Sequence, residues 1–291
     1  RPVPCPPPEA RPRRLTVGDV EALINDPYGF YAKRILRLAR LDELDADPGA
    51  AEYGQVVHAA MHRFLAALPR HWPGDERALE AWSLATEAAL DDQKPTPALE
   101  AIWQARLARI GEFVIAEERP RRPALLRTHT EVEGRHVLDR PGGAIEIEGR
   151  ADRIDEMTDG TLRILDYKTG QLPAREAVRD GSAPQLPVEA WMAESGAFER
   201  VPASPVSGLE YWRLSGGGAK PGEVVRLEEG KQPLDTGQAI EAARNGVERL
   251  ADDFLLGGAC FIARPHPKRD KRSDYDHLAR TDEWSSEGGA E

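Results

Sequence analysis

The stretch "ILDYKTG", from Ile164 to Gly170, places an acid and a lysine at the end of an apolar run. Alternate residues of a β-strand face the same side, so Leu162, Ile164, Asp166 and Lys168 are predicted to share one face. That face begins with apolar residues and is therefore expected to be buried. Because an unpaired buried carboxylate is costly, Asp166 needs a cation or strong hydrogen bonds in this position.

A second acid lies on the strand predicted just before. The segment "AIEIEGRADRID" (144–155) alternates like a strand, and the turn "DEMTDG" folds it back onto the first stretch. Asp152 and Ile154 have the same parity, which predicts that Asp152 also lies on the apolar side. The isoleucines of "AIEI" have the opposite parity, so we expect the alternation to break near Gly149, as a bulge.

Two acids beside one lysine suit a bound divalent ion. Oxygen ligands favour a hard ion, so Mg²⁺ or Mn²⁺ is expected. Such an ion lowers the pKa of a bound water and neutralises charge on a phosphate, which is the chemistry of phosphodiester hydrolysis. The alternative for an Asp-x-Lys pattern taken by itself is a buried ion pair in a hairpin.

The rest of the chain predicts an α+β fold, with a central mixed sheet and helices packed on it. Hydrophobic spacing of about 3.6 residues predicts helices up to residue 118, and alternation predicts strands after it. The first helical stretch, 15–38, is broken at "NDPYG", with Thr16 or Asp19 as its cap. Further helices are expected over 50–68, 75–92, 97–118, 183–195 and 232–256, and further strands in "LLRTHTEVEGRHVL", "SGLEYWRL" and "EVVRL".

The expected domain organisation has three parts. Residues 1–14 are rich in proline and predict an extended linker, and the start at Arg1 suggests a fragment of a longer protein. Residues 15–262 form the domain, with a helical region over 15–120, a catalytic core over about 125–230 and a C-terminal helix over about 232–256. Residues 263–291 are predicted to be a polar, irregular tail.

Composition narrows the class of protein. The chain has 291 residues, 40% of them hydrophobic, and neither a membrane-spanning run nor a signal peptide is expected. The net charge of −11 weighs against a nucleic-acid binder, although the basic runs 11–14, 32–40 and 263–272 are able to follow a phosphate backbone. The alternative for each basic run is a solvated surface.

The two cysteines, Cys5 and Cys260, are too few for a disulfide framework, a four-cysteine zinc site or an iron–sulfur cluster. They fit a reducing cytoplasm. The only "GK" pair, at 230–231, lacks the surrounding phosphate-binding loop, so no ATPase is expected in this chain.

The motifs together resemble a known family. "IEGRADRID" and "RILDYKTG" are similar to the core of PD-(D/E)XK nucleases of the RecB type. "GQVVHAAMHRFL" resembles their G-x-x-x-H helix, with Gly54 and His58, and "APQLPVEAWMA" resembles their Q-x-x-x-Y helix, with Gln185. The opening and closing segments resemble more specifically the C-terminal nuclease domains of AddB-type proteins, in their alphaproteobacterial form.

The resemblance implies a role for each matching residue. Asp152 and Asp166 would be the metal-binding carboxylates, Lys168 the catalytic lysine and His58 a further metal ligand. Gln185 would position the site or the DNA. A zinc site in "HAAMH" is the alternative for His58, but this stretch lacks the glutamate of H-E-x-x-H.

The chain also departs from the family. Glu189 stands where the Q-x-x-x-Y motif has its tyrosine, so a DNA contact at that position is in doubt, and Glu189 is a candidate to reach the metal instead. Many relatives carry an iron–sulfur cluster that staples the domain. No such cluster is expected here, so packing is expected to close the domain.

The implied function is that of a Mg²⁺-dependent deoxyribonuclease domain. It would cut single-stranded DNA at double-strand breaks, in a cytoplasmic complex with an AddA-type helicase–nuclease partner, for recombinational repair. Two alternatives stay open: a catalytically silent module that binds DNA or the partner protein, and a stand-alone exonuclease of the CRISPR-adaptation type.

Overall fold

The computed structural model describes residues 1–39, 49–263 and 273–285 and contains one mixed β-sheet. The strands run in the order β1-β3-β4-β5-β6, and β2 also pairs with β3. Their bounds are β1 Arg14–Thr16, β2 Leu125–Arg140, β3 Gly143–Met157, β4 Leu162–Lys168, β5 Val206–Leu214 and β6 Gly222–Arg226. The predicted α+β class with a mixed sheet is confirmed.

The long strand β3 organises the sheet. It pairs along its whole length with β2, in an antiparallel ladder. On its other edge it pairs with β1 at Glu146–Glu148 and with β4 at Arg153–Glu156. Residues 149–152 of β3 lie between these two partners, so the edge is open there.

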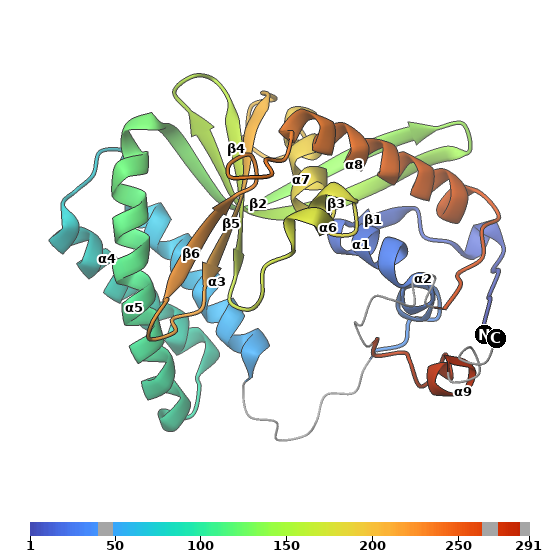
Figure 1. Cartoon of the computed structure of the whole chain (residues 1–291), viewed down its shortest axis with the longest axis horizontal. Helices are drawn as coiled ribbons and strands as arrows, with labels where there is room; N and C mark the ends of the chain where they lie inside the picture. Colours follow the sequence, from blue (N-terminus) through green and yellow to red (C-terminus); the bar gives the residue numbers. More distant parts are fainter. Residues whose placement is uncertain (40–48, 264–272, 286–291) are drawn as a thin grey trace.

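Helices cover both faces of this sheet (Figure 1). On one face α3, α4 and α5 pack over Leu165, Tyr167 and Trp212; on the other, α1, α7 and α8 pack over Ile154 and Ile164. The helices are α1 Val17–Asn25, α2 Pro27–Phe30, α3 Ala50–Ala67, α4 Asp75–Gln93, α5 Pro97–Arg121, α6 Arg175–Arg179, α7 Gln185–Glu194, α8 Thr236–Leu250 and α9 Thr281–Ser285. Short 3₁₀ or π-helical turns occupy Pro8–Ala10, Tyr31–Ile35, Arg122–Ala124 and Ala251–Leu256.

Charged residues anchor α5 to the sheet. Three carboxylates face three guanidinium groups in a largely buried set that we call the balanced cluster: Glu118, Asp155 and Glu210 with Arg121, Arg153 and Arg163. Arg153 is fully buried, pairs with Glu118 and lies 2.8 Å from Asp155. Arg121 lies 2.8 Å from Glu210. Each carboxylate of the set is therefore paired with at least one guanidinium group.

The face alternation of β3 changes at Asp152, which corrects the expected bulge at Gly149. The β2–β3 register continues through the pair Gly134–Gly149 without an inserted residue. Ala151 and Ile154 belong to the same core, although three positions separate them, so the side chains change face between them. Opposite this point, Glu131 has a positive φ of 51°, which non-glycine residues rarely adopt.

Gly149 has a different role, as a site of close approach. A Cβ atom at this position would lie 2.9 Å from the Cγ2 atom of Val17, at the start of α1. Thr16 caps that helix by accepting from the Asp19 amide, and Asp19 accepts from the Thr16 amide in return. The missing side chain at Gly149 therefore lets the capped start of α1 pack against the open edge of β3.

The N-terminal segment, expected to be a linker, is anchored to the domain. Arg11 is buried and donates to the carbonyls of Phe254, at 2.8 Å, and Ala259, at 2.9 Å. A disulfide joins Cys5 to Cys260, whereas a reducing compartment and closure of the domain by packing were expected. The bond connects positions 255 residues apart, so spacing along the sequence could not reveal it.

The described part of the C-terminal tail also packs, although a polar, irregular tail was expected. Ala279 and Thr281 are buried, and Ala279 lies in a small core with Tyr28 and Ala263. The basic run 264–272 lies outside the described residues. The predicted helix over 232–256 consists of α8 followed by the π-helical turn Ala251–Leu256.

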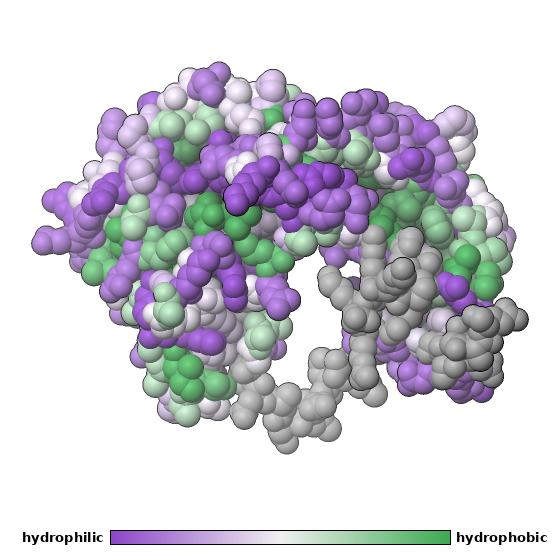
Figure 2. Space-filling view, in the orientation of Figure 1, coloured by the Kyte–Doolittle hydropathy of each residue, from purple (hydrophilic) through white to green (hydrophobic). Residues whose placement is uncertain are grey.

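The surface is predominantly polar. On the face drawn in Figure 2, hydrophilic residues cover most of the described surface, and hydrophobic residues form smaller patches between them. Among the described helices, none is both long enough and apolar enough to span a membrane.

Candidate active site

The end of β4 places Asp166 and Lys168 beside each other, as the strand alternation predicts. Asp166 is 1% exposed, whereas the Lys168 side chain is 31% exposed. Lys168 Nζ donates to Asp166 Oδ1 at 2.7 Å and to Gln185 Oε1 at 3.1 Å. Lys168 is therefore held against the buried acid while part of it stays accessible to solvent.

Asp152 approaches the same place from the open edge of β3. Its Oδ2 atom accepts a hydrogen bond of 2.8 Å from the Tyr167 amide, which fixes the carboxylate against the end of β4. The change of face at this position directs Asp152 toward α3. The two predicted carboxylates thus come from neighbouring strands, and Tyr167 connects them.

His58 reaches this pair from α3. The buried stripe of that helix includes Val57 and Met61, and His58 lies at its edge, with a side chain that is 29% exposed. Its Nδ1 atom is 3.2 Å from Asp152 Oδ1, and its Nε2 atom is 2.9 Å from the Tyr167 carbonyl oxygen. His62, one turn further on, bonds to Thr130 instead, at 2.7 Å.

Glu131 is a site residue that the sequence reasoning missed. Its carboxylate lies 3.9 Å from His58 Nδ1 and pairs with Arg150 at 2.9 Å. The positive φ of Glu131 coincides with the change of face at Asp152, and strained backbone of this kind gathers at functional sites. The alternation in "LLRTHTEVEGRHVL" does not indicate that Glu131 joins the site, because the location of its side chain depends on how β2 pairs with β3.

Gln185 and Glu189 lie on the other side of Asp166. They stand one turn apart on α7, and Gln185 Nε2 bridges Asp166 Oδ1, at 2.7 Å, and Glu189 Oε1, at 3.2 Å. Glu189 is 2% exposed, and its Oε2 atom has no hydrogen-bond partner among the described residues. Gln185 therefore positions Asp166 and Lys168, and it connects them to a second buried acid.

Negative charge is in excess here. Burial, with the nearby charge of Asp152, raises the pKa of Asp166 to about 6. Burial raises the pKa of Glu189 well above its usual value, and Asp166 and Asp152 raise it further. Burial by itself would lower the pKa of His58, but its hydrogen bond to Asp152 and the surrounding acids raise it. Each shift indicates that positive charge is favoured at this point.

The donor set fits a divalent metal ion. Ligand atoms of His58, Glu131 and Asp152 all lie within 4.8 Å of one another, in a mixed nitrogen and oxygen group that suits a divalent cation. The predicted set of His58, Asp152 and Asp166 shares two members with this compact group. The third predicted ligand, Asp166, lies outside this compact group. Its carboxylate instead accepts hydrogen bonds from Lys168 and Gln185.

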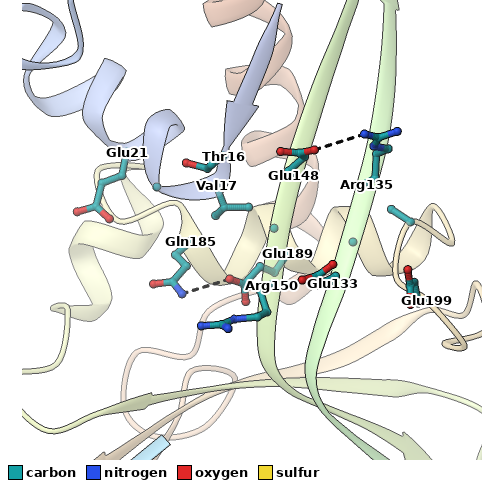
Figure 3. Close-up of a pocket in the computed structure, with 14 residues that line it drawn as sticks. Thr16, Val17, Glu21, Glu133, Arg135, Glu148, Arg150, Gln185, Glu189 and Glu199 are labelled. Atoms are coloured by element: carbon teal, nitrogen blue, oxygen red, sulfur yellow. Dashed lines mark hydrogen bonds and ion pairs between the residues drawn. The ribbon is translucent and has the colours of Figure 1, made fainter. Parts of the chain in front are cut away.

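Two cavities of about 780 Å³ each adjoin these acids. The one we call the His58 cavity is lined by His58, His62, Arg63, Arg150, Glu131 and Asp152, among others. The other, which we call the Glu189 cavity, is lined by Gln185, two arginines and five acids: Glu21, Glu133, Glu148, Glu189 and Glu199 (Figure 3). Arg150 lines both cavities, so they meet at the candidate site.

Comparison with curated proteins finds relatives at low identity. Uncharacterized proteins of Rickettsia bellii and Rickettsia typhi are 30% and 31% identical over 187 and 212 residues, or 64% and 70% of this chain. A Streptococcus pyogenes protein, named as one of the subunits of an ATP-dependent helicase/deoxyribonuclease, is 26% identical over 170 residues, or 56% of this chain. The matches span 22%, 24% and 15% of those longer proteins.

A family model matches over nearly the whole chain. It describes the PD-(D/E)XK nuclease superfamily and covers residues 14–268. The match includes both strands that carry Asp152 and Asp166, as well as the helices of His58 and Gln185. The sequence motifs, the mixed sheet and this match agree, and the chain belongs to the PD-(D/E)XK nuclease superfamily.

Proposed function

We propose that this chain is a divalent-metal-dependent deoxyribonuclease domain that hydrolyses phosphodiesters of single-stranded DNA. The observation that carries the proposal is the meeting of His58, Asp152, Asp166 and Lys168, which come from three separate elements. A structural ion pair would need only the acid and the lysine. The histidine, the second acid and the nearby Glu131 add negative charge and ligand atoms that such a pair does not require.

The proposed roles follow from the contacts. His58 and Asp152 would hold Mg²⁺ or Mn²⁺, with Glu131 or Asp166 as a further ligand. The bound ion would supply a water of lowered pKa and stabilise charge on the phosphate. Lys168, held by Asp166 and Gln185, would orient the attacking water and balance the added negative charge. Gln185 would keep Lys168 and Asp166 in place.

A single strand is the substrate that best fits the recessed acids. Asp166 is almost fully buried, so the scissile phosphate has to reach into the site. The backbone of a single strand bends into such a recess more readily than a stiff duplex does. The His58 cavity offers two histidines and two arginines and is the proposed path of the phosphates, because the acid-rich Glu189 cavity repels them.

The proposed biological setting is an AddAB-type helicase–nuclease that processes double-strand breaks for recombinational repair. Its support is the similarity to the streptococcal protein, whose name includes helicase and deoxyribonuclease activities. The chain would receive its strand from an AddA-type motor protein. A stand-alone exonuclease of the CRISPR-adaptation type differs from this proposal in needing no such partner.

The second candidate function is a catalytically silent module that holds DNA or the partner. Glu189 favours it, because this acid replaces the tyrosine of the motif and enlarges the negative charge beside the site. Against it stands the complete set of Asp152, Asp166, Lys168 and His58. Metal-dependent cleavage distinguishes the two functions.

The test is cleavage of end-labelled DNA by the purified chain in Mg²⁺ or Mn²⁺, on single-stranded and duplex substrates. The proposal predicts cutting of the single strand, its loss in Lys168→Ala, and normal cutting by Lys220→Ala, which removes an exposed lysine paired with Glu223. Thermal melting confirms that each variant is folded. Absence of cutting by the folded parent, both alone and with the motor protein, would contradict the proposal and favour the silent module.

A further inference from the structure

Glu189 has no role in the metal group around His58, yet it is one of the most deeply buried acids of the domain. It lies on the far side of Gln185, whose amide separates it from Asp166. Gln185 satisfies Glu189 Oε1, and Oε2 has no hydrogen-bond partner in the described part of the chain. A buried carboxylate oxygen without a partner is costly and needs an explanation.

A second buried oxygen without a partner belongs to Tyr211 of β5, which pairs with Asp166 in the β4–β5 ladder. Tyr211 is 1% exposed, and its hydroxyl makes no hydrogen bond to a described residue. Burial raises the pKa of this hydroxyl, and the charges of Asp166, Glu189 and Glu21 raise it further, so three acids act on one phenol. Two buried side-chain oxygens, Glu189 Oε2 and the Tyr211 hydroxyl, thus have no hydrogen-bond partner among the described residues.

The Glu189 cavity is suited to cations. Five acidic residues and two arginines line it, and Glu189 lies among them, hydrogen-bonded to Gln185 (Figure 3). Arg135 is paired with Glu146 and Glu148, and Arg150 with Glu131. A cavity lined by one sign of charge concentrates ions of the opposite sign. The His58 cavity, with its histidines and arginines, lacks this character.

We propose that Glu189 is a ligand of a second divalent cation, at the inner end of the Glu189 cavity and separate from the group of His58, Glu131 and Asp152. Mg²⁺ keeps several waters and commonly takes one or two carboxylates, so Glu189 needs only one acidic neighbour. Glu21 lines the same cavity, and Tyr211 offers a neutral oxygen nearby. The inference rests on the proposed nuclease function, because it gives the chain two ions at adjoining positions.

The test counts bound ions rather than activity. Mn²⁺ is titrated into the whole chain at neutral pH, and the free ion is followed by its electron paramagnetic resonance signal. The parent is expected to bind two Mn²⁺ ions per chain and Glu189→Gln one, with at least a tenfold weaker affinity at the lost site. Glu199→Gln is the matched control, because Glu199 lines the same cavity at an exposed position, and this variant keeps two ions.

A second pair of variants keeps the inference testable if Glu189→Gln does not fold. His58→Ala removes a ligand of the group of His58, Glu131 and Asp152 and is expected to leave one bound ion. The double variant His58→Ala/Tyr211→Phe is expected to bind that remaining ion more weakly. A folded parent that binds a single ion overturns the inference, and so does Glu189→Gln with two. Cleavage by a parent with one ion keeps the nuclease proposal and rejects the second site. Two ions without cleavage, both alone and with the motor protein, support the site and reject the nuclease.

Discussion

Two sets of buried charges lie on this sheet, and they are built differently. In the balanced cluster three carboxylates face three guanidinium groups, and Thr128 and Trp212 donate further hydrogen bonds to these acids. In the set that we call the acid-rich cluster, Asp152, Asp166, Glu131 and Glu189 surround Lys168 and His58. Only the first set supplies its own counter-charge in full.

The direction of the pKa shifts expresses this difference. Burial by itself would raise the pKa of Asp155 and Glu210, but the neighbouring arginines hold both below their usual range. In the acid-rich cluster, burial and like charge raise the pKa of Asp166 and of Glu189. These four acids are buried to a similar degree, so the supply of cations decides the sign of the pKa shift. The balanced cluster anchors α5, whereas the acid-rich cluster favours a bound cation, as the proposed function requires.

The largest expected effect is on catalysis. Asp166→Asn should lower single-strand cleavage by about a thousandfold or more, because it removes a carboxylate that holds Lys168 beside the metal group. The metal-free variant should nevertheless be about 1–3 kcal/mol more stable than the parent, since a buried charge with a raised pKa is gone. Single-turnover cleavage and urea unfolding in EDTA measure the two effects, and a variant that is both inactive and less stable would remove the contrast between the clusters.

Breaking the balanced cluster should have the opposite result. Arg153→Met leaves Glu118 and Asp155 buried with too few cations and should lower the free energy of unfolding by about 3–5 kcal/mol. Arg226→Met is the control, because its contacts are 3.7 Å or longer and partly exposed, and its cost should stay below about 1 kcal/mol. Urea unfolding compares the variants, and an equal cost for both would show that the buried pairs carry no special weight.

Divalent metal ions should stabilise the folded chain by binding at the acid-rich cluster, not at the balanced cluster. At a free Mg²⁺ or Mn²⁺ concentration of about 100 times the dissociation constant, each occupied site should add about 2.7 kcal/mol to the free energy of unfolding. Asp152→Asn should reduce this gain strongly, whereas Arg226→Met should keep it. Thermal melting with and without EDTA measures the effect. An equal gain in Asp152→Asn would place the bound ion elsewhere in the chain.

The smallest effect concerns pH. The folded-state pKa of Asp166 is about 6, above its ordinary value of 3.8, so its ionisation opposes folding above pH 6. Lowering the pH from 7 to 5 should relieve about 1–2 kcal/mol of that penalty in the metal-free parent. Asp166→Asn has no such group, so the stability difference between variant and parent should shrink over this range. A difference that does not change with pH would mean that Asp166 stays ionised.

Much of the site could be predicted from local patterns. Strand alternation placed Asp166 and Lys168 on one side, and the helical motif selected His58 over His62. The features that were missed depend on contacts between distant segments. Glu131 joins the site through its pairing opposite β3, and the change of face at Asp152 follows from that ladder. The sequence of β3 also gave no sign that Arg153 is fully buried, because its partner Glu118 lies on α5.

The N-terminal segment shows the same limit of local reasoning. Its prolines predict an extended linker, but Pro8–Ala10 form a 3₁₀ turn, and Arg11 and Cys5 are held by residues some 250 positions further along the chain. Composition predicts the backbone conformation that a segment prefers in the absence of tertiary contacts. It does not reveal which carbonyls or thiols the rest of the fold brings to it.

The most direct test of the central claim is reversible metal control of cleavage in a single sample. The purified chain is mixed with 5′-labelled single-stranded DNA in EDTA, then Mn²⁺ is added in excess, beside Lys168→Ala and Lys220→Ala. The account predicts no product before the addition, product from the parent and Lys220→Ala after it, and none from Lys168→Ala. Cleavage that persists in EDTA, or that survives in Lys168→Ala, would contradict the assignment of this acid-rich cluster as the catalytic centre.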